Sequence, residues 1–277
     1  MIDLHCHTTE SDGSLLPCEL IETALAIGLE ALAITDHDTF AGFDQAAPLA
    51  KEKGLELVCG LELSTKFESR TVHLIAYFLG NGPEEGFREW ILQLQESRFS
   101  RNMLLLDRLK TKGISIAAED LNQHGPLPGR PHIARIMVER GFVSSMQQAF
   151  DEYLDESACC YVPRQEPSFS EAVERIKGSG GLSSLPHPGR VSRDIGKMST
   201  MVHEMRKMGL AAIEVYHSDH SSSDVALFST VAEELGLSIT GGSDFHGQAK
   251  PDIELGTGRG GNLCIPYSVL DRLRSSA

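Results

Sequence analysis

The amino-acid sequence predicts an α/β fold, a barrel of strand–helix units related to the (β/α)8 form. Short apolar runs recur along the chain, and helical patterns lie between most of them. One long stretch lacks any strand-like run, which predicts a helical insertion in the barrel. With 277 residues, the chain is long enough for one large domain with an insertion.

Seven short apolar runs, each followed by a polar cluster, are the expected strands. Their alternation with helical patterns implies parallel strands joined by helical crossovers. The expected strands cover residues 2–4, 31–34, 55–58, 72–77, 182–185, 211–216 and 237–240.

Helices are expected where apolar residues recur with helical spacing ahead of a glycine. Pro17 begins the first such pattern, which carries Leu20, Ile21 and Ala24 and ends before Gly28. The other helical patterns of the barrel cover residues 168–177, 202–208 and 225–235.

The stretch from 83 to 163 predicts a helical insertion between the fourth and fifth strands. Glu84 and Glu85 begin a long helical pattern that closes with Lys110 and Lys112, the charge order that a helix dipole favours. A loop at 125–132 and two further helical patterns follow. We therefore expect a barrel of residues 1–80 and 165–277 and an insertion at 81–164 that selects the substrate as a lid or cap.

Composition and charge exclude several classes of protein. No run approaches the roughly 18 apolar residues of a membrane span, and His5 and His7 stand where a signal peptide would be apolar. We therefore expect a cytoplasmic protein without a membrane partner. The net charge of −14 argues against a general nucleic-acid binder, and nothing implies an obligate protein partner.

Histidines and carboxylates accompany all seven expected strands. His5 and His7 share one face of the first strand, because side chains alternate along a strand. A lone pair of this spacing is weak evidence, since 11 histidines in 277 residues produce about 0.4 such pairs by chance. The carboxyl ends of parallel barrel strands meet at one face, which predicts a metal site. The candidate ligands are His5, His7, Asp12, His37, Glu62, His73, His187, Asp244 and His246.

Nine ligands are more than one ion can use, so we expect two or three divalent ions with one carboxylate bridging. Nitrogen and oxygen ligands without thiolate favour Mn²⁺, Fe²⁺ or Zn²⁺ over Ca²⁺, and Mn²⁺ is our first choice. Closely spaced ions ordinarily hold a hydroxide nucleophile and clamp the oxygens of a phosphoryl group. The cluster therefore predicts a metal-dependent phosphoesterase.

The motifs that carry these residues resemble the PHP family, named for polymerase and histidinol phosphatase. In chain order they are DLHCHTTESDGSL, ITDHDTFAG, GLELS, HLIAY, PHPGR, EVYHSDHS and GGSDFHG. The resemblance covers residues 2–80 and about 165–262 and implies a distorted (β/α)7 barrel with a trinuclear site. It implies three ligand groups, of which the first two share Glu62: His5, His7, Glu62 and Asp244; Glu62, His73 and His187; and Asp12, His37 and His246.

Within this family the sequence is most similar to enzymes that act on nucleoside 3′,5′-bisphosphates or on the 5′ ends of short RNA. The resemblance implies hydrolysis of a phosphate monoester, such as adenosine 3′,5′-bisphosphate to AMP and phosphate, by a metal-bound hydroxide. A 5′→3′ exoribonuclease on short RNA is the first alternative. A histidinol phosphate phosphatase and a non-catalytic metal-binding module are the others.

Substrate contacts are expected from basic residues near the metal motifs and in the insertion. Arg130 and His132 lie at a helix start, which suits an anion, although His132 fits a capping role as well. Arg164, His217 and His220 are further candidates, and His220 is a candidate proton donor. The candidate catalytic residues are His5, His7, Asp12, His37, Glu62, His220 and Asp244.

Overall fold

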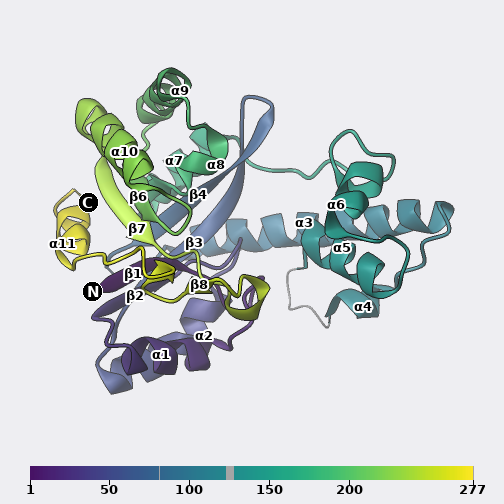
Figure 1. Ribbon diagram of the computed structural model, residues 1–277, viewed down its shortest axis with the longest axis horizontal. Helices are drawn as coiled ribbons and strands as arrows, with labels where there is room; N and C mark the ends of the chain where they lie inside the picture. The colour runs from purple at the N-terminus through teal and green to yellow at the C-terminus, as the bar shows by residue number, and fades with distance from the viewer. Residues whose placement is uncertain (81, 123–127, 277) are drawn as a thin grey trace. The chain divides into compact units, whose positions relative to one another are not determined.

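The computed structural model describes residues 1–80, 82–122 and 128–276. The chain divides into two compact units, which Figure 1 draws as ribbons. Unit 1 comprises Met1–Glu89 and Glu166–Ala277, and unit 2 comprises Trp90–Gln165. Residues 125–127 of the loop expected at 125–132 lie outside the described residues.

Within the described residues, unit 1 contains one seven-stranded sheet whose strand order follows the chain. Its strands are β1 (Ile2–Cys6), β2 (Ala31–Ile34), β3 (Glu56–Phe67), β4 (Arg70–Phe78), β5 (Leu182–Leu185), β6 (Ala212–His217) and β7 (Ser238–Gly242). Beyond β7, the Asp244 amide donates to the His5 carbonyl at 2.8 Å, and the His7 amide donates to the Phe245 carbonyl at 2.9 Å. These bonds link the last strand to the first, so the sheet nearly closes into a barrel.

The expectation that all strands run parallel is wrong for β4. This strand pairs antiparallel with both β3 and β5, whereas the other neighbouring pairs are parallel. Only residues 68 and 69 separate β3 from β4, and a parallel crossover needs a dozen residues or more. Because of the reversal, the first half of β4 lies beside the second half of β3, with His73 opposite Ser64. β3 also continues to Phe67, so Glu62 lies inside the strand rather than after its end.

Helices cover the barrel where the sequence predicts them, and three more α-helices occur in the described residues. The expected patterns correspond to α1 (Pro17–Ala26), α7 (Phe169–Gly178), α9 (Ile195–Lys207) and α10 (Ser222–Leu235). The additional helices are α2 (Ala41–Lys53), α8 (Pro188–Val191) and α11 (Ser268–Ser275), and a short hairpin pairs β8 (Ile253–Glu254) with β9 (Gly258–Arg259). No helix in the described ranges is long and apolar enough to cross a membrane.

Apolar clusters of described residues stabilise unit 1. One combines Leu20 and Ile21 of α1 with Leu32 and Ile34 of β2. Another combines the strand residues Ile2 and Ala212, among others, with Leu270 and Leu273 of α11. Burying such side chains contributes about 1.5–3 kcal/mol each, so the strands are fixed firmly enough to hold polar groups at their ends.

Hydrogen bonds to Asp3 link β1 to the segment after β7. The buried Asp3 carboxylate accepts hydrogen bonds from the Ser243 amide at 2.9 Å, the Ser243 hydroxyl at 2.6 Å and the Gly256 amide at 2.8 Å. Burial raises the pKa of Asp3, against the opposing effect of these hydrogen bonds. The contacts hold Ser243, and with it Asp244, next to His5.

Unit 2 is helical in its described residues. It contains most of α3 (Glu85–Thr111), together with α4 (Ala118–Asn122), α5 (Arg130–Glu139), α6 (Met146–Ala149) and the π-helical turn η1 (Phe150–Leu154). Leu109, Ile133, Met137 and Leu154 belong to its own apolar core. Unit 2 therefore has the helical character that the sequence predicts for the insertion.

Candidate metal centre and active site

All nine candidate metal ligands lie together in unit 1. Their nitrogen and oxygen atoms form four groups, and within each group the ligand atoms lie within 4.8 Å of one another. The groups are His7, Asp12, His37 and His246; His5, His7 and Asp244; His5, Glu62 and His187; and His37, Glu62 and His73. Because the groups share members, the nine side chains form one continuous cluster.

The backbone around the cluster is shaped to bring these side chains together. Asp244 and His187 have φ angles of 57° and 33°, in the left-handed region that non-glycine residues rarely adopt. A side chain at position 242 would place its Cβ 2.3 Å from the His5 amide nitrogen, so only glycine permits this approach of β7 to β1. At position 242 the two strands are therefore too close for any residue that has a side chain. This indicates that the cluster, rather than local backbone preference, determines the conformation here.

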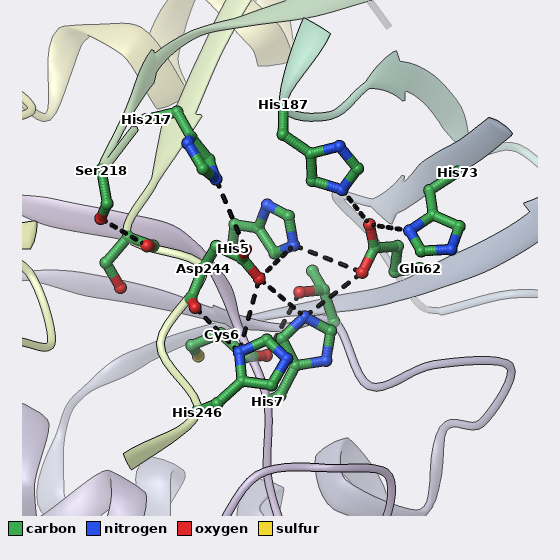
Figure 2. Close-up of polar contacts among 12 residues, drawn as sticks. His5, Cys6, His7, Glu62, His73, His187, His217, Ser218, Asp244 and His246 are labelled. Atoms are coloured by element: carbon green, nitrogen blue, oxygen red, sulfur yellow. Dashed lines mark hydrogen bonds and ion pairs between the residues drawn. The ribbon is translucent and has the colours of Figure 1, made fainter. Parts of the chain in front are cut away.

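Glu62 lies at the centre of the cluster, with each carboxylate oxygen facing a different set of imidazoles (Figure 2). Oε1 lies 2.9 Å from Nδ1 of His73 and 2.8 Å from Nε2 of His187. Oε2 lies 3.5 Å from Nε2 of His5 and 3.3 Å from Nε2 of His7. This is the arrangement of a carboxylate that can bridge two ions.

Asp244 and Asp12 complete the cluster on the side of His7. Oδ1 of Asp244 lies 3.5 Å from Nε2 of His5 and 3.5 Å from Nε2 of His7. Oδ1 of Asp12 lies 3.2 Å from Nε2 of His246, and Oδ2 lies 3.6 Å from Nε2 of His37. The Nδ1 atom of His246 donates to the Asp244 carbonyl at 2.8 Å, which leaves its Nε2 lone pair facing Asp12.

The donor set fits divalent metal ions. Two ligands that are each about 2.1 Å from a tetrahedral ion lie about 3.4 Å apart, close to the distances from His5 and His7 to Glu62 and Asp244. Nε2 of His5 and Nε2 of His7 are buried and have no hydrogen-bond partner among the described residues. Buried polar atoms normally have partners, so these two nitrogens point to ligands that an ion would satisfy.

The carboxylates and imidazoles shift one another's pKa values. Burial alone would lower the pKa of His5 and His7, but the surrounding carboxylates outweigh it. The pKa of His5 lies well above its usual range, and that of His7 rises to about 9. Burial would raise the pKa of Glu62, but the nearby imidazoles hold it well below its usual value. At neutral pH, His5 and His7 therefore carry protons that a metal ion must displace.

The imidazoles of His37 and His187 differ from those of His5 and His7. Burial lowers the pKa of His37 to about 3 and that of His187 to about 4. Both rings are therefore neutral at physiological pH, the form that binds a metal ion.

Glu214, in the interior of β6, is a candidate site residue that the sequence did not predict. Its Oε1 accepts a hydrogen bond from Nδ1 of His5 at 2.9 Å, and its Oε2 accepts one from the His187 amide at 2.6 Å. The first contact directs Nε2 of His5 into the cluster, as the outer partners of metal-bound histidines do. A signal was present, since a glutamate inside the apolar run AAIEVY is rarely buried without a partner.

Two cations at Asp244 were likewise not expected as site residues. Oδ2 of Asp244 lies 2.9 Å from Nη2 of Arg190 and 2.7 Å from Nζ of Lys250. Arg190 also contacts Oδ2 of Asp219 at 2.7 Å. These contacts bring two positive groups to the edge of the cluster, where an anionic substrate would approach.

Asp36 supports the cluster through the loop after β1. Its carboxylate accepts hydrogen bonds from the Thr8 amide at 2.7 Å and the Ser11 hydroxyl at 2.6 Å. The Ser11 hydroxyl lies 3.4 Å from Nδ1 of His7. Asp36 therefore acts on the loop that carries Asp12 and reaches His7 only through Ser11.

His217, the last residue of β6, and His220, just after it, differ in which ring nitrogen carries the proton. Nδ1 of His217 accepts a hydrogen bond from the Asp219 amide at 3.0 Å, so Nε2 carries the proton of the neutral ring, 3.5 Å from Oδ2 of Asp244. Nδ1 of His220 donates to the Val215 carbonyl at 2.8 Å, so its Nε2 is unprotonated in the neutral ring. The ring centroids of His217 and His220 lie 5.1 Å apart.

The three candidate substrate contacts of the insertion belong to unit 2, whereas the nine candidate ligands belong to unit 1. Arg130 donates to the Leu154 carbonyl at 3.1 Å and lies 5.6 Å over the ring of Tyr161. Nδ1 of His132 accepts a hydrogen bond from the Gly129 amide at 3.0 Å, which caps α5. Arg164 is partly buried in the segment that follows Tyr161.

Known proteins resemble this chain over most of its length. The profile of the PHP domain matches residues 3–156. The chain is 34% identical to a 5′-3′ exoribonuclease of Haemophilus influenzae, over 88% of this chain and 89% of that protein. It is 32% identical to a 3′,5′-nucleoside bisphosphate phosphatase of Chromobacterium violaceum, over 92% and 90%. A crystal structure from Bifidobacterium adolescentis, assigned as a metal-dependent phosphoesterase, matches with a TM-score of 0.82 and 29% identity over 100% and 96% of the two chains.

Substitution of Glu214 by glutamine tests its support of His5. The change preserves size but removes the charge and one of the two acceptors, so the apparent affinity for Mn²⁺ is expected to fall about 10–100-fold. Competition with a chromogenic chelator measures the affinity. The matched control is Glu233→Gln on the exposed face of α10, which should bind as the unmodified protein does. Wild-type affinity in Glu214→Gln would contradict the assignment.

Metal binding is expected to release protons and to strengthen as the pH rises. Below the pKa of His7, about 9, the metal-free site holds protons that the ion must displace. At pH 7.5, roughly one to two protons per chain should leave. Calorimetry in buffers of different ionisation enthalpy counts them. Affinity should increase from pH 6 toward pH 9 and then level off, and heats that do not depend on the buffer would refute this charge assignment.

Proposed function

This chain belongs to the PHP family, and from that premise we propose that it hydrolyses the 3′-phosphate of a nucleoside 3′,5′-bisphosphate. The chain is a metal-dependent phosphoesterase, a hydrolase of phosphoester bonds. The observation that carries the site assignment is the position of Glu62, whose two oxygens face separate sets of imidazoles. The choice of a bisphosphate is supported by the similarity to the Chromobacterium violaceum enzyme along both chains.

The ligand set suits Mn²⁺, Fe²⁺ or Zn²⁺, because it contains nitrogen and oxygen donors without thiolate. We assign Glu62 to two ions, one shared with His5, His7 and Asp244 and the other with His73 and His187. Asp12, His37 and His246 are assigned to a third. When bound, such ions supply an activated water and neutralise charge on the phosphoryl oxygens.

Arg190 and Lys250 are assigned to bind the phosphate that is cleaved. Both side chains lie within 2.9 Å of Oδ2 of Asp244, so their positive groups are already held at the edge of the cluster. Charged hydrogen bonds to phosphate oxygens are stronger than neutral ones. Because the groups are fixed before the substrate arrives, they can stabilise charge that develops in the transition state.

We assign proton donation to His217 rather than to His220. The leaving oxygen, O3′ of the nucleoside, needs a proton. The neutral His217 ring carries one on Nε2, facing Asp244, whereas the His220 proton is on Nδ1 and is engaged by Val215. Burial also lowers the pKa of His220, which keeps it neutral. His220 then serves to position His217, whose ring it neighbours.

The insertion is proposed to select the second phosphate. Arg130 is the first candidate, because its guanidinium is fixed by the Leu154 carbonyl and the Tyr161 ring. Arg164 is the second. Since His132 caps the helix that begins at Arg130, we propose that it contributes to substrate binding by holding this helix start in place.

A 5′→3′ exoribonuclease acting on short RNA is the second candidate function. It is favoured by the 34% identity to the Haemophilus influenzae enzyme. The chemistry is the same, because the terminal nucleotide of RNA also leaves through its O3′ oxygen. One protein can therefore have both activities.

A parallel assay of three substrates tests the proposed function. Mn²⁺-loaded protein is offered adenosine 3′,5′-bisphosphate, histidinol phosphate and a 5′-phosphorylated trinucleotide RNA. We expect AMP and phosphate from the bisphosphate, with kcat/KM at least about tenfold above that for histidinol phosphate, because a site for the second phosphate is worth one or more charged hydrogen bonds. Asp244→Ala is the control, and its activity should fall by about 10²-fold or more. Preference for histidinol phosphate, or full activity of Asp244→Ala, would overturn the proposal.

Removal of Arg130 tests the role of the insertion. Arg130→Ala should raise KM for adenosine 3′,5′-bisphosphate by about 10–100-fold, since a charged hydrogen bond contributes about 1.5–3 kcal/mol. Hydrolysis of adenosine 3′-monophosphate, which lacks the second phosphate, should stay unchanged. Arg135→Ala, on the exposed face of the same helix, is the matched control. Equal losses on both substrates would show that Arg130 serves the fold or the whole site.

A further inference from the structure

A cavity in unit 1 begins at the candidate metal ligands and continues away from them. Its inner part has a volume of about 210 Å³ and is lined by His73, His187, Arg190 and Arg70, among others. In Figure 2, His73 and His187 lie together on one side of Glu62. The inner part therefore starts at the imidazoles that face Oε1 of Glu62.

A larger cavity of about 530 Å³ adjoins the inner part, because Arg70, Val72 and Val191 line both. It lies between the turn that joins β3 to β4 and the first half of α9, where Lys197 and Met201 contribute to its wall. A volume of this size is within the range of small-molecule sites. We call the two cavities together the hairpin groove.

Two cations of the hairpin groove have no partner of their own. The side chains of Arg70 and Lys197 are exposed and make no hydrogen bond or ion pair within the part of the chain that the structure describes. Two carboxylates also line the groove, and one of them, Glu204, is paired with Lys207 at 2.8 Å. The other is Glu68, at the turn between β3 and β4. In a chain with a net charge of −14, unpaired cations beside a phosphate-cleaving site indicate an anionic ligand.

The walls of the hairpin groove are apolar between these cations. Val72, Val191 and Met201 form this part of the lining. Alternating cations and apolar surface suit a ligand that repeats phosphate, sugar and base. A free phosphate ion would use the cations but none of the apolar wall.

The bond that breaks determines which substrate extends past the cleaved phosphate. In both candidate reactions a water oxygen adds to phosphorus, the bond from phosphorus to O3′ of the first nucleotide breaks, and O3′ takes a proton. With a bisphosphate the departing group is inorganic phosphate. With RNA the phosphate remains esterified to the shortened chain, so only RNA places nucleotides on the far side of the cleaved phosphate.

We propose that the hairpin groove binds the RNA chain on the far side of the cleaved phosphate, with Arg70 and Lys197 contacting successive phosphates. The proposal rests on the proposed function, because it takes the metal cluster as the place of cleavage. It assigns the two activities to different parts of the site. The bisphosphate uses the cluster without contacting Arg70 or Lys197, whereas RNA uses the cluster and both of these cations.

The test compares Arg70→Ala/Lys197→Ala with the unmodified protein on two substrates. Each phosphate contact of a single strand contributes about fivefold at 0.1 M salt, so kcat/KM for a 5′-phosphorylated tetranucleotide RNA, which has two phosphates beyond the cleaved one, should fall about 25-fold, mainly through KM. The dependence of log kcat/KM on log salt should become shallower by about 1.4. Hydrolysis of adenosine 3′,5′-bisphosphate should change less than twofold. Lys53→Ala/Lys177→Ala changes the net charge equally at exposed sites elsewhere and should behave as the unmodified protein.

A binding measurement separates this proposal from the proposed function. In the Asp244→Ala background, fluorescence anisotropy measures the affinity for a 5′-phosphorylated RNA that carries a 3′ fluorophore. A loss of about 25-fold on removal of both cations supports the groove even if neither substrate is cleaved. Unchanged RNA affinity, or an equal loss of activity on RNA and bisphosphate, would overturn it.

Discussion

The carboxylate of Glu62 is buried among imidazoles, and its two oxygens serve different sets of them. A buried anion is costly unless charged or hydrogen-bonded groups surround it. Here the histidines of several strands must converge on one residue, which fixes the barrel end to a single arrangement. The low pKa of Glu62 and the raised pKa values of His5 and His7 reflect this mutual dependence.

Other residues of unit 1 bring the side chains of the cluster together around Glu62. The reversal of β4 brings His73 to the end of the barrel where the parallel strands finish. Asp3 and Gly242 allow β7 to approach β1, so that Asp244 lies beside His5. Glu214 links His5 to His187 through both of its oxygens. Each of these residues acts on the cluster through another residue, which explains why they are buried and polar although none is a candidate ligand.

Much of the fold and the candidate metal cluster could be predicted, because the signals are local. Apolar runs located the strands, and each candidate ligand lies inside its run or in the segment that follows it. The direction of β4 could not be predicted, because the polar residues in the second half of β3 conceal the two-residue turn that follows. Arg190 and Lys250 meet at Asp244 only through folding, so no sequence spacing marks them. The cap formed by His132 depends on the backbone amide of Gly129. The motif around His132 is compatible with both capping and anion binding, so the sequence does not distinguish the two roles.

The most direct test of a carboxylate that bridges two ions is a metal count. Unmodified protein and Glu62→Gln are reconstituted with Mn²⁺, separated from free metal by gel filtration and analysed by inductively coupled plasma mass spectrometry, with circular dichroism to verify folding. A bridging Glu62 predicts two or three ions per chain in the unmodified protein and at most one in the folded variant, because one oxygen of the amide no longer serves as a ligand. A single ion in the unmodified protein, or an undiminished count in Glu62→Gln, would contradict it.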